Sequence, residues 1–399
     1  MNPSGTKDTL IRIGKVIFFA TVFATALFLV YNQVYNSGKT GPEGLSGYES
    51  DTPEHIGVLN RFFEEGIAPP HPLWHILVKL FSFLTTLNVE WSAVIVSASL
   101  ITLWSYLVFR VVAASLRPRR GMIARSDEPF YLFVTLVILT VGPLCIPFYD
   151  HIIFRGQGSP NVWHNVTLWT VKPFALVGMI ATVLALRTQT TSYYAAALAA
   201  VFVSILAKPS FILVFLPALY LLVLSRHYGS RRNLCFIALM TLLSGAVLLF
   251  QFMHTFTGDS KIVFDFLGVW SLQSKNVVVS ILLGLAFPLV LLRFHPQIMK
   301  NDYIFLSWVQ VLLGIGLFAF FAESGSRYTH GNFGWSYIIA MGFLYLFSIV
   351  AFFKDYHAIG PFKRSILNAL LGLQTMTGMY YLLKVLEGQN PLYISLFFD

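Results

Sequence analysis

The residues best suited to acid–base chemistry stand in the sequence Asp51-Thr-Pro-Glu-His55. Carboxylate and imidazole groups are common proton acceptors and donors in catalysis, so Asp51, Glu54 and His55 are candidate catalytic residues. Pro53 suits the first turn of a helix, and Asp51 is a residue type preferred at a helix start. The pattern predicts an amphipathic helix over residues 54–65, with these groups at its beginning. The plainer interpretation is that Asp51 only caps this helix.

Cationic and imidazole side chains follow in four later segments. A bound or departing anion needs fixed positive charge, and neutral polar groups can orient a substrate. The candidate donor-phosphate and substrate-binding residues are Lys208, Arg155, Arg327, His75, His330, Asp150 and His164. Lys208 lies between two apolar runs. A charged side chain there raises the free energy of the protein unless it binds an anion, faces a cavity or extends to the lipid headgroups.

The histidines also raise the question of a metal. His71 and His75 have a ligand-like spacing, but Pro72 between them favours a helix start, which leaves His71 outside the helix. The sequence therefore predicts no dedicated zinc site. The need for a divalent metal ion stays open, and no other cofactor is expected.

The composition indicates that a membrane must position these residues. Of the 399 residues, 56% are hydrophobic and 11% are charged, whereas soluble domains carry about 25% charged residues. The net charge of +9 comes from short Lys and Arg clusters between apolar runs. That distribution is typical of charges flanking membrane spans, and we expect no nucleic-acid partner. The chain is thus predicted to be an all-α, polytopic integral membrane protein.

Apolar runs long enough to cross a membrane number about eleven. The predicted spans are 13–33, 92–115, 129–148, 166–187, 192–207, 209–226, 233–254, 276–293, 303–322, 337–354 and 365–386. We interpret 1–399 as one transmembrane domain. Residues 35–91 would form a long first outside loop with juxtamembrane helices, in which the apolar stretch 72–88 lies at the membrane interface.

The placement of 72–88 decides the topology. If this stretch does not cross, the basic loops fall on the cytoplasmic side and most acidic residues fall outside, as the positive-inside rule requires. This predicts a cytoplasmic N-terminus and an outside C-terminus. The first span is expected to remain uncleaved, because no small-residue cleavage site follows it and the residues near its end, Val30, Tyr31 and Val34, are bulky.

Motifs of nucleotide-binding and hydrolase sites are absent from the sequence. There is no Walker A, GxGxxG or GxSxG pattern, and no predicted cytoplasmic loop is long enough for a nucleotide-binding domain. Any group transfer is therefore expected to use a donor already present in the membrane.

The order of these features resembles the GT-C superfamily of membrane glycosyltransferases, particularly bacterial members that use polyprenyl-phosphate-linked sugars. The resemblance covers most of the chain as architecture. In residues it rests on Asp51-Thr-Pro-Glu-His55, Pro70-His-Pro-Leu-Trp-His75, Trp163-His-Asn165, Lys172-Pro173 and Lys208-Pro209-Ser210.

The resemblance implies inverting sugar transfer on the outer face of a bacterial plasma membrane, to a glycan, lipid or protein acceptor. Asp51 matches the position of the general base, and basic groups would bind the departing lipid phosphate. The sequence lacks an Asp-x-Asp motif and a large C-terminal outside domain, in which it departs from some relatives.

Two alternatives remain. A polysaccharide polymerase or ligase acting on lipid-linked glycans would depend on Arg327 rather than Asp51. A lipid or solute transporter would place ionisable residues in mid-membrane and show paired broken helices. The predicted spans are nearly free of charge, and Lys172 is the main exception.

Overall fold

The computed structural model describes residues 3–39, 47–66, 69–117, 127–145, 156–255 and 261–389. These residues are mainly helical, as predicted. The longer helices are α1 (Pro3–Tyr35), α2 (Thr52–Glu64), α3 (Leu73–Thr85), α4 (Val89–Leu116), α5 (Glu128–Thr140), α6 (Val166–Thr188), α7 (Thr191–Ala207), α8 (Ser210–Ser225), α9 (Arg231–Thr255), α13 (Asp302–Phe320), α14 (Gly334–Lys354) and α15 (Pro361–Leu386). The shorter elements are β1 (Ile262–Phe264), α10 (Gly268–Ser271), α11 (Val277–Gly284), α12 (Ala286–Phe294), β2 (Phe321–Glu323), and the 3-10 helices η2 (Pro296–Lys300), η3 (Gly325–His330) and η4 (Tyr356–Ala358).

Fewer helices qualify as membrane spans than the eleven predicted. Within the described ranges, six are long and apolar enough to cross a membrane, or seven if the bent pair α11–α12 forms one span. The six are Thr9–Tyr35, Val89–Leu116, Val166–Thr188, Arg231–Thr255, Asp302–Phe320 and Gly325–Lys354. The predicted number of eleven was therefore wrong, although a helix lies within each predicted range.

Helix length explains most of this difference. A helix of 13 residues such as α5 extends about 20 Å, whereas the hydrocarbon core is about 30 Å thick. The helices α7 and α8 have 17 and 16 residues. The helix α15 has 26 residues, but polar side chains recur along it. For α5 and the pair α11–α12, the apolar sequence thus overstated the length of continuous helix.

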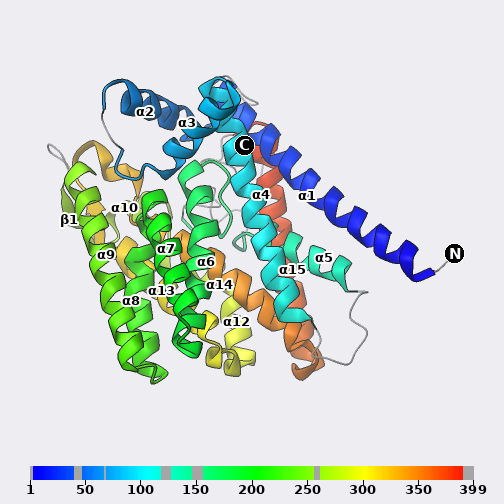
Figure 1. Ribbon diagram of the computed structural model, residues 1–399. Helices are drawn as coiled ribbons and strands as arrows, with labels where there is room; N and C mark the ends of the chain where they lie inside the picture. Colours follow the sequence, from blue (N-terminus) through cyan, green and yellow to red (C-terminus); the bar gives the residue numbers. More distant parts are fainter. Residues whose placement is uncertain are drawn as a thin grey trace.

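The helices α2 and α3 lie across one end of the bundle of longer helices (Figure 1). Pro53 occupies the first turn of α2, which buries Ile56 and Leu59 on one face. The helix α3 has 13 residues and buries Trp74 and His75. Both amphipathic helices of the first loop therefore form as predicted, and they bring His75 to the interior.

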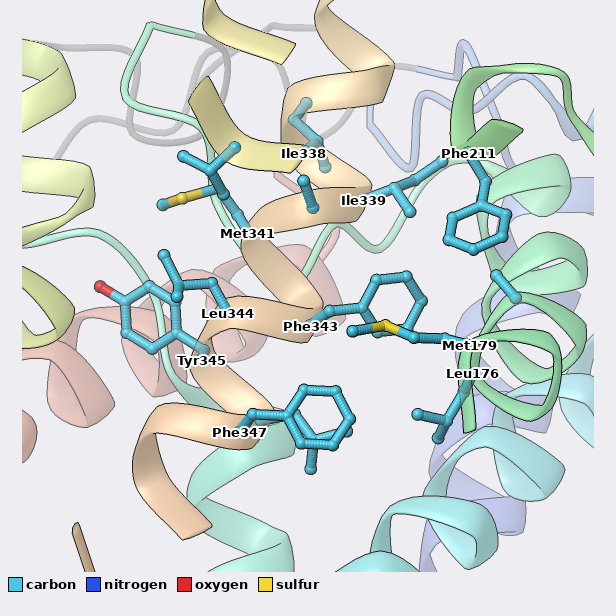
Figure 2. Packing of buried hydrophobic residues seen from close by; sticks show 14 of the residues in the cluster. Leu176, Met179, Phe211, Ile338, Ile339, Met341, Phe343, Leu344, Tyr345 and Phe347 are labelled. Carbon is cyan, nitrogen blue, oxygen red and sulfur yellow. The ribbon is translucent and has the colours of Figure 1, made fainter. Parts of the chain in front are cut away.

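The helix α14 is the centre of the hydrophobic core. In Figure 2 Phe343 points toward Met179 of α6 and Phe211 of α8, whereas Met341 and Tyr345 point to the opposite side of α14. The rings of Phe343 and Phe211 lie 5.8 Å apart in an edge-to-face arrangement. A Cβ at Gly314 would come within 2.8 Å of the backbone nitrogen of Tyr337, so the absence of a side chain permits the close approach of α13. This central helix begins at the end of the bundle that carries α2 and α3.

The pair α11–α12 is bent by 65°. Breaking a helix releases backbone carbonyls, which must find donors inside a membrane. Here Leu283 accepts from the backbone of Leu144 at 3.1 Å and from Gln374 at 3.3 Å, and Gly284 accepts from the Tyr345 hydroxyl at 2.6 Å. The break was not predicted, although Pro288 marks it in the sequence, since proline has no N–H to donate to the Gly284 carbonyl four residues earlier.

Residues 156–165, which we call the inner segment, are all buried and are not helical. Irregular backbone is tolerated at such depth only where its polar groups are satisfied. Side chains from distant helices donate to its carbonyls: Trp270 to Gly156 at 2.8 Å, Tyr337 to Gln157 at 3.2 Å, Lys172 to Pro160 at 3.0 Å and Gln33 to Trp163 at 2.6 Å. The inner segment is thus fastened by α1, α6, α10 and α14 together.

A short antiparallel sheet joins two segments that are far apart in sequence. The strands β1 and β2 pair in the register Ile262 opposite Glu323. The pairing fixes Glu323 at the start of the segment that carries Arg327 and His330. The sequence patterns did not predict these strands.

Candidate functional site

Asp51 is held by the end of the inner segment. Its backbone N–H donates to the His164 carbonyl at 3.2 Å, and the Asn165 side-chain amide donates to Asp51 Oδ2. Asp51 occupies the position before α2, but its carboxylate makes no capping hydrogen bond to that helix. The interpretation of Asp51 as merely a helix cap was therefore wrong. Its carboxylate is instead oriented by a residue 114 positions away.

Asn165 also caps α6, which explains how the amide is fixed. Its Oδ1 accepts from the backbone N–H of Leu168 and from the hydroxyl of Thr167, both at 2.8 Å. With the oxygen committed to the helix start, the amide nitrogen faces Asp51. Asparagine suits this double role, because it is a preferred cap and carries both an acceptor and donors.

Lys208 reaches the same group of residues from the turn between α7 and α8. Its Nζ donates to the Thr167 hydroxyl at 2.8 Å and lies 4.7 Å from the centre of the Trp335 ring. The side chain is buried, which does not fit a lysine that extends to lipid headgroups. Burial lowers the pKa of Lys208 to about 8, and the nearby Asp51 carboxylate partly opposes this effect. Lys208, Thr167, Asn165 and Asp51 thus form one continuous chain of polar contacts.

Three histidines gather beside this chain. His55 Nδ1 lies 3.2 Å from His75 Nε2, and the ring centre of His71 lies 6.4 Å from that of His55. Burial lowers the pKa of His71 to about 3 and that of His75 to about 4. Burial, with His75, His71 and Lys208 as smaller causes, places the pKa of His55 well below its usual value. At neutral pH the cluster therefore supplies neutral imidazoles.

Arg327 approaches from the segment after β2. Its Nε donates to Glu323 Oε2 at 2.8 Å, and Asn332 donates to the same oxygen at 2.7 Å. The positive charges of Lys208 and Arg327 both contribute to lowering the pKa of His71, after the larger effect of burial. His71 of the first loop is therefore close enough to Arg327, in the segment after β2, to respond to its charge.

A pocket borders these groups at Trp335. It is lined by Gln273, Phe318, His330, Gly331, Gly334, Trp335, Tyr337 and Ile338. The Trp335 ring lies 6.2 Å from the His164 ring, so Trp335 stands between the pocket and the polar chain. Trp335 therefore lies between Lys208 and this small pocket.

Other predicted site residues are placed differently. Glu54 lies on the exposed side of α2. Asp150 and Arg155 lie outside the described residues. Over the described ranges, no three His, Cys, Asp or Glu residues are grouped so that they could hold a metal ion.

Sequence reasoning missed the roles of Asn165 and Thr167. The pattern Asn165-Val-Thr167 reads as a glycosylation sequon, but an asparagine directly before a long apolar run is also a helix-cap signal. That signal could have identified Asn165. No local pattern indicated that its amide would meet Asp51, because the two residues are brought together only by the tertiary fold.

A second polar cluster lies at the other end of α6, about 34 Å away by helix length. The buried Asp302 carboxylate forms ion pairs with Arg187 at 2.7 Å and with Arg226 at 3.3 Å. The Tyr228 hydroxyl donates to it at 2.9 Å. This cluster ties α6, α8 and α13 together and was also not predicted.

The arrangement around Asp51 combines a fixed carboxylate, two cations and neutral imidazoles beside an aromatic-lined pocket. Such a set can accept a proton from a hydroxyl and stabilise a nearby anion. No protein-family model matches this chain, and no curated protein matches it in sequence.

Proposed function

We propose that the protein is a membrane glycosyltransferase that transfers a sugar from a polyprenyl-phosphate-linked donor to an acceptor at the outer membrane face. The observation that carries this proposal is the convergence of Asp51, Asn165 and Lys208 from three distant segments. Burying a lysine costs free energy unless its charge is paired, so a buried lysine favours a site that binds an anion. The same site holds a candidate base, which a simple anion-binding site would not need.

In the proposed reaction, Asp51 accepts the proton of an acceptor hydroxyl while that oxygen attacks the anomeric carbon of the donor. The new glycosidic C–O bond forms as the bond between the anomeric carbon and the phosphate oxygen breaks. The lipid phosphate leaves with the electron pair, and Lys208 and Arg327 stabilise its charge. Attack opposite the leaving group inverts the anomeric centre.

Replacing the carboxylate tests this role. Asp51→Asn keeps the size of the side chain but removes the base, so we expect sugar transfer to fall by about 10²–10⁴-fold. The measurement is transfer from radiolabelled polyprenyl-phosphate sugars in membranes containing the protein. Glu54→Gln is the matched control, because Glu54 is an exposed carboxylate on the helix that follows Asp51. Equal rates for folded Asp51→Asn and wild type would remove Asp51 from the mechanism.

The bend in α11–α12 favours a second candidate, a transporter of lipids or solutes. Transporters often build substrate sites from discontinuous helices near the membrane midplane. At this bend, however, the carbonyls of Leu283 and Gly284 are already occupied by protein donors. Uptake of a solute or lipid into proteoliposomes without sugar transfer would favour the transporter.

A further inference from the structure

Lys172 is a buried lysine that the proposed reaction does not use. It lies in α6 and is only 1% exposed. Its Nζ donates to the Pro160 carbonyl at 3.0 Å and lies over the rings of Trp169 at 4.5 Å and Trp104 at 5.5 Å. A cation held by a carbonyl and two indole faces is a strong local attachment, since both interactions strengthen away from water.

The Trp169 ring connects this cation to the end of the inner segment. Trp169 lies against Trp163, with ring centres 4.9 Å apart and planes inclined by 33°. Trp163 directly precedes His164, whose carbonyl accepts from Asp51, and Asn165, whose amide donates to the Asp51 carboxylate. A column of contacts therefore runs from Lys172 through Trp169 and Trp163 to the two residues that hold Asp51.

We propose that Lys172 is a positioning residue, whose ammonium group keeps the inner segment folded inward so that His164 and Asn165 hold Asp51 in place. The geometry of this attachment is independent of the reaction, whereas its catalytic consequence rests on the proposed function. Lys172 then serves as a structural attachment between α6 and the inner segment.

Thiol labelling tests the attachment without any activity assay. Val162 is fully buried in the inner segment, so Val162→Cys in a background with Cys145→Ser and Cys235→Ser should resist a membrane-impermeant maleimide. Adding Lys172→Met should speed labelling by about tenfold or more, because the segment opens locally when the attachment is lost. Lys172→Arg keeps the cation and should stay protected. Lys79→Met, an exposed lysine over the Phe63 ring, is the matched control.

A milder variant covers the case in which Lys172→Met does not fold. Trp169→Phe keeps an aromatic ring but shortens the column, and it should raise labelling less than Lys172→Met. Protection of Val162→Cys in both folded variants, or labelling of Lys172→Arg as fast as that of Lys172→Met, would overturn the proposal.

The link to Asp51 has its own measurement. If sugar transfer is detected, Lys172→Met should lower kcat with little change in KM, and it should cause no further loss in an Asp51→Asn background. Additive losses would overturn the positioning role. If no sugar transfer is found at all, the proposed function fails while the labelling result still decides the attachment.

Discussion

Replacing Lys208 by methionine should change how stability depends on pH. Burial lowers the pKa of Lys208 from 10.5 to about 8. Since one pKa unit corresponds to about 1.4 kcal/mol, burying the charged form costs about 3 kcal/mol. The unfolded chain keeps this proton up to about pH 10.5, whereas the folded protein releases it from about pH 8. The folded state binds fewer protons in that window, so its stability should rise with pH by about 3 kcal/mol.

The stability of Lys208→Met should not show this rise with pH, because methionine does not titrate. We would measure denaturant unfolding in detergent micelles from pH 7 to 10.5 and take the difference between wild type and variant, which cancels the titration of other groups. Lys79→Met controls for the loss of one positive charge at an exposed position. A difference between wild type and Lys208→Met that does not change across this range would refute the reasoning that Lys208 is held buried and charged at neutral pH.

Three further substitutions test other contacts. Asn165→Ala should lower the free energy of unfolding by about 1–3 kcal/mol, measured in detergent, and lower sugar transfer, because it removes the α6 cap and the donor to Asp51. Asp302→Ala should cost about 3–5 kcal/mol in the same unfolding assay, because two arginines lose their buried partner; a loss below about 1 kcal/mol would contradict this. Gly378→Ala should lower the melting temperature, since a Cβ there would overlap the Thr140 carbonyl oxygen and overpacking costs about 1–3 kcal/mol.

The amino-acid sequence predicted where helices lie better than how far each one extends. Hydropathy reports whether a segment is apolar, and residues 129–148 are apolar throughout. The helix α5 nevertheless ends at Thr140, where Asn161 donates to the carbonyls of Ile138 and Val141 at 2.9 and 3.0 Å. Gly142 and Pro143 are a local stop signal for this helix, but the Asn161 side chain that satisfies the carbonyls at its end comes from another segment.

In the candidate site, too, the sequence indicated some residues, whereas the contacts between them depend on the tertiary fold. Lys208 stands out in the sequence because it lies between two apolar runs, and Asp51 stands out because it precedes a predicted helix together with Glu54 and His55. The partners that fix them are Thr167 and Asn165, whose residue types are common and whose role appears only when α6, α2 and the α7–α8 turn meet. Lys172 stood out as a charge within a predicted span; its partner Trp169 lies three residues earlier on the same helix, but Trp104 and the Pro160 carbonyl come from other segments.

The inner segment also has a consequence for the order in which the protein can be assembled. The donors to the Gly156 and Gln157 carbonyls, Trp270 and Tyr337, lie 114 and 180 residues further along the chain. At about 5–20 residues per second of synthesis, Tyr337 emerges about 10 to 40 s after Gln157. An unpaired carbonyl costs several kcal/mol in hydrocarbon, so during that interval this stretch must stay in contact with water or with the insertion machinery. The inner segment, which holds the candidate base, therefore reaches its final fold only after α14 has been synthesised.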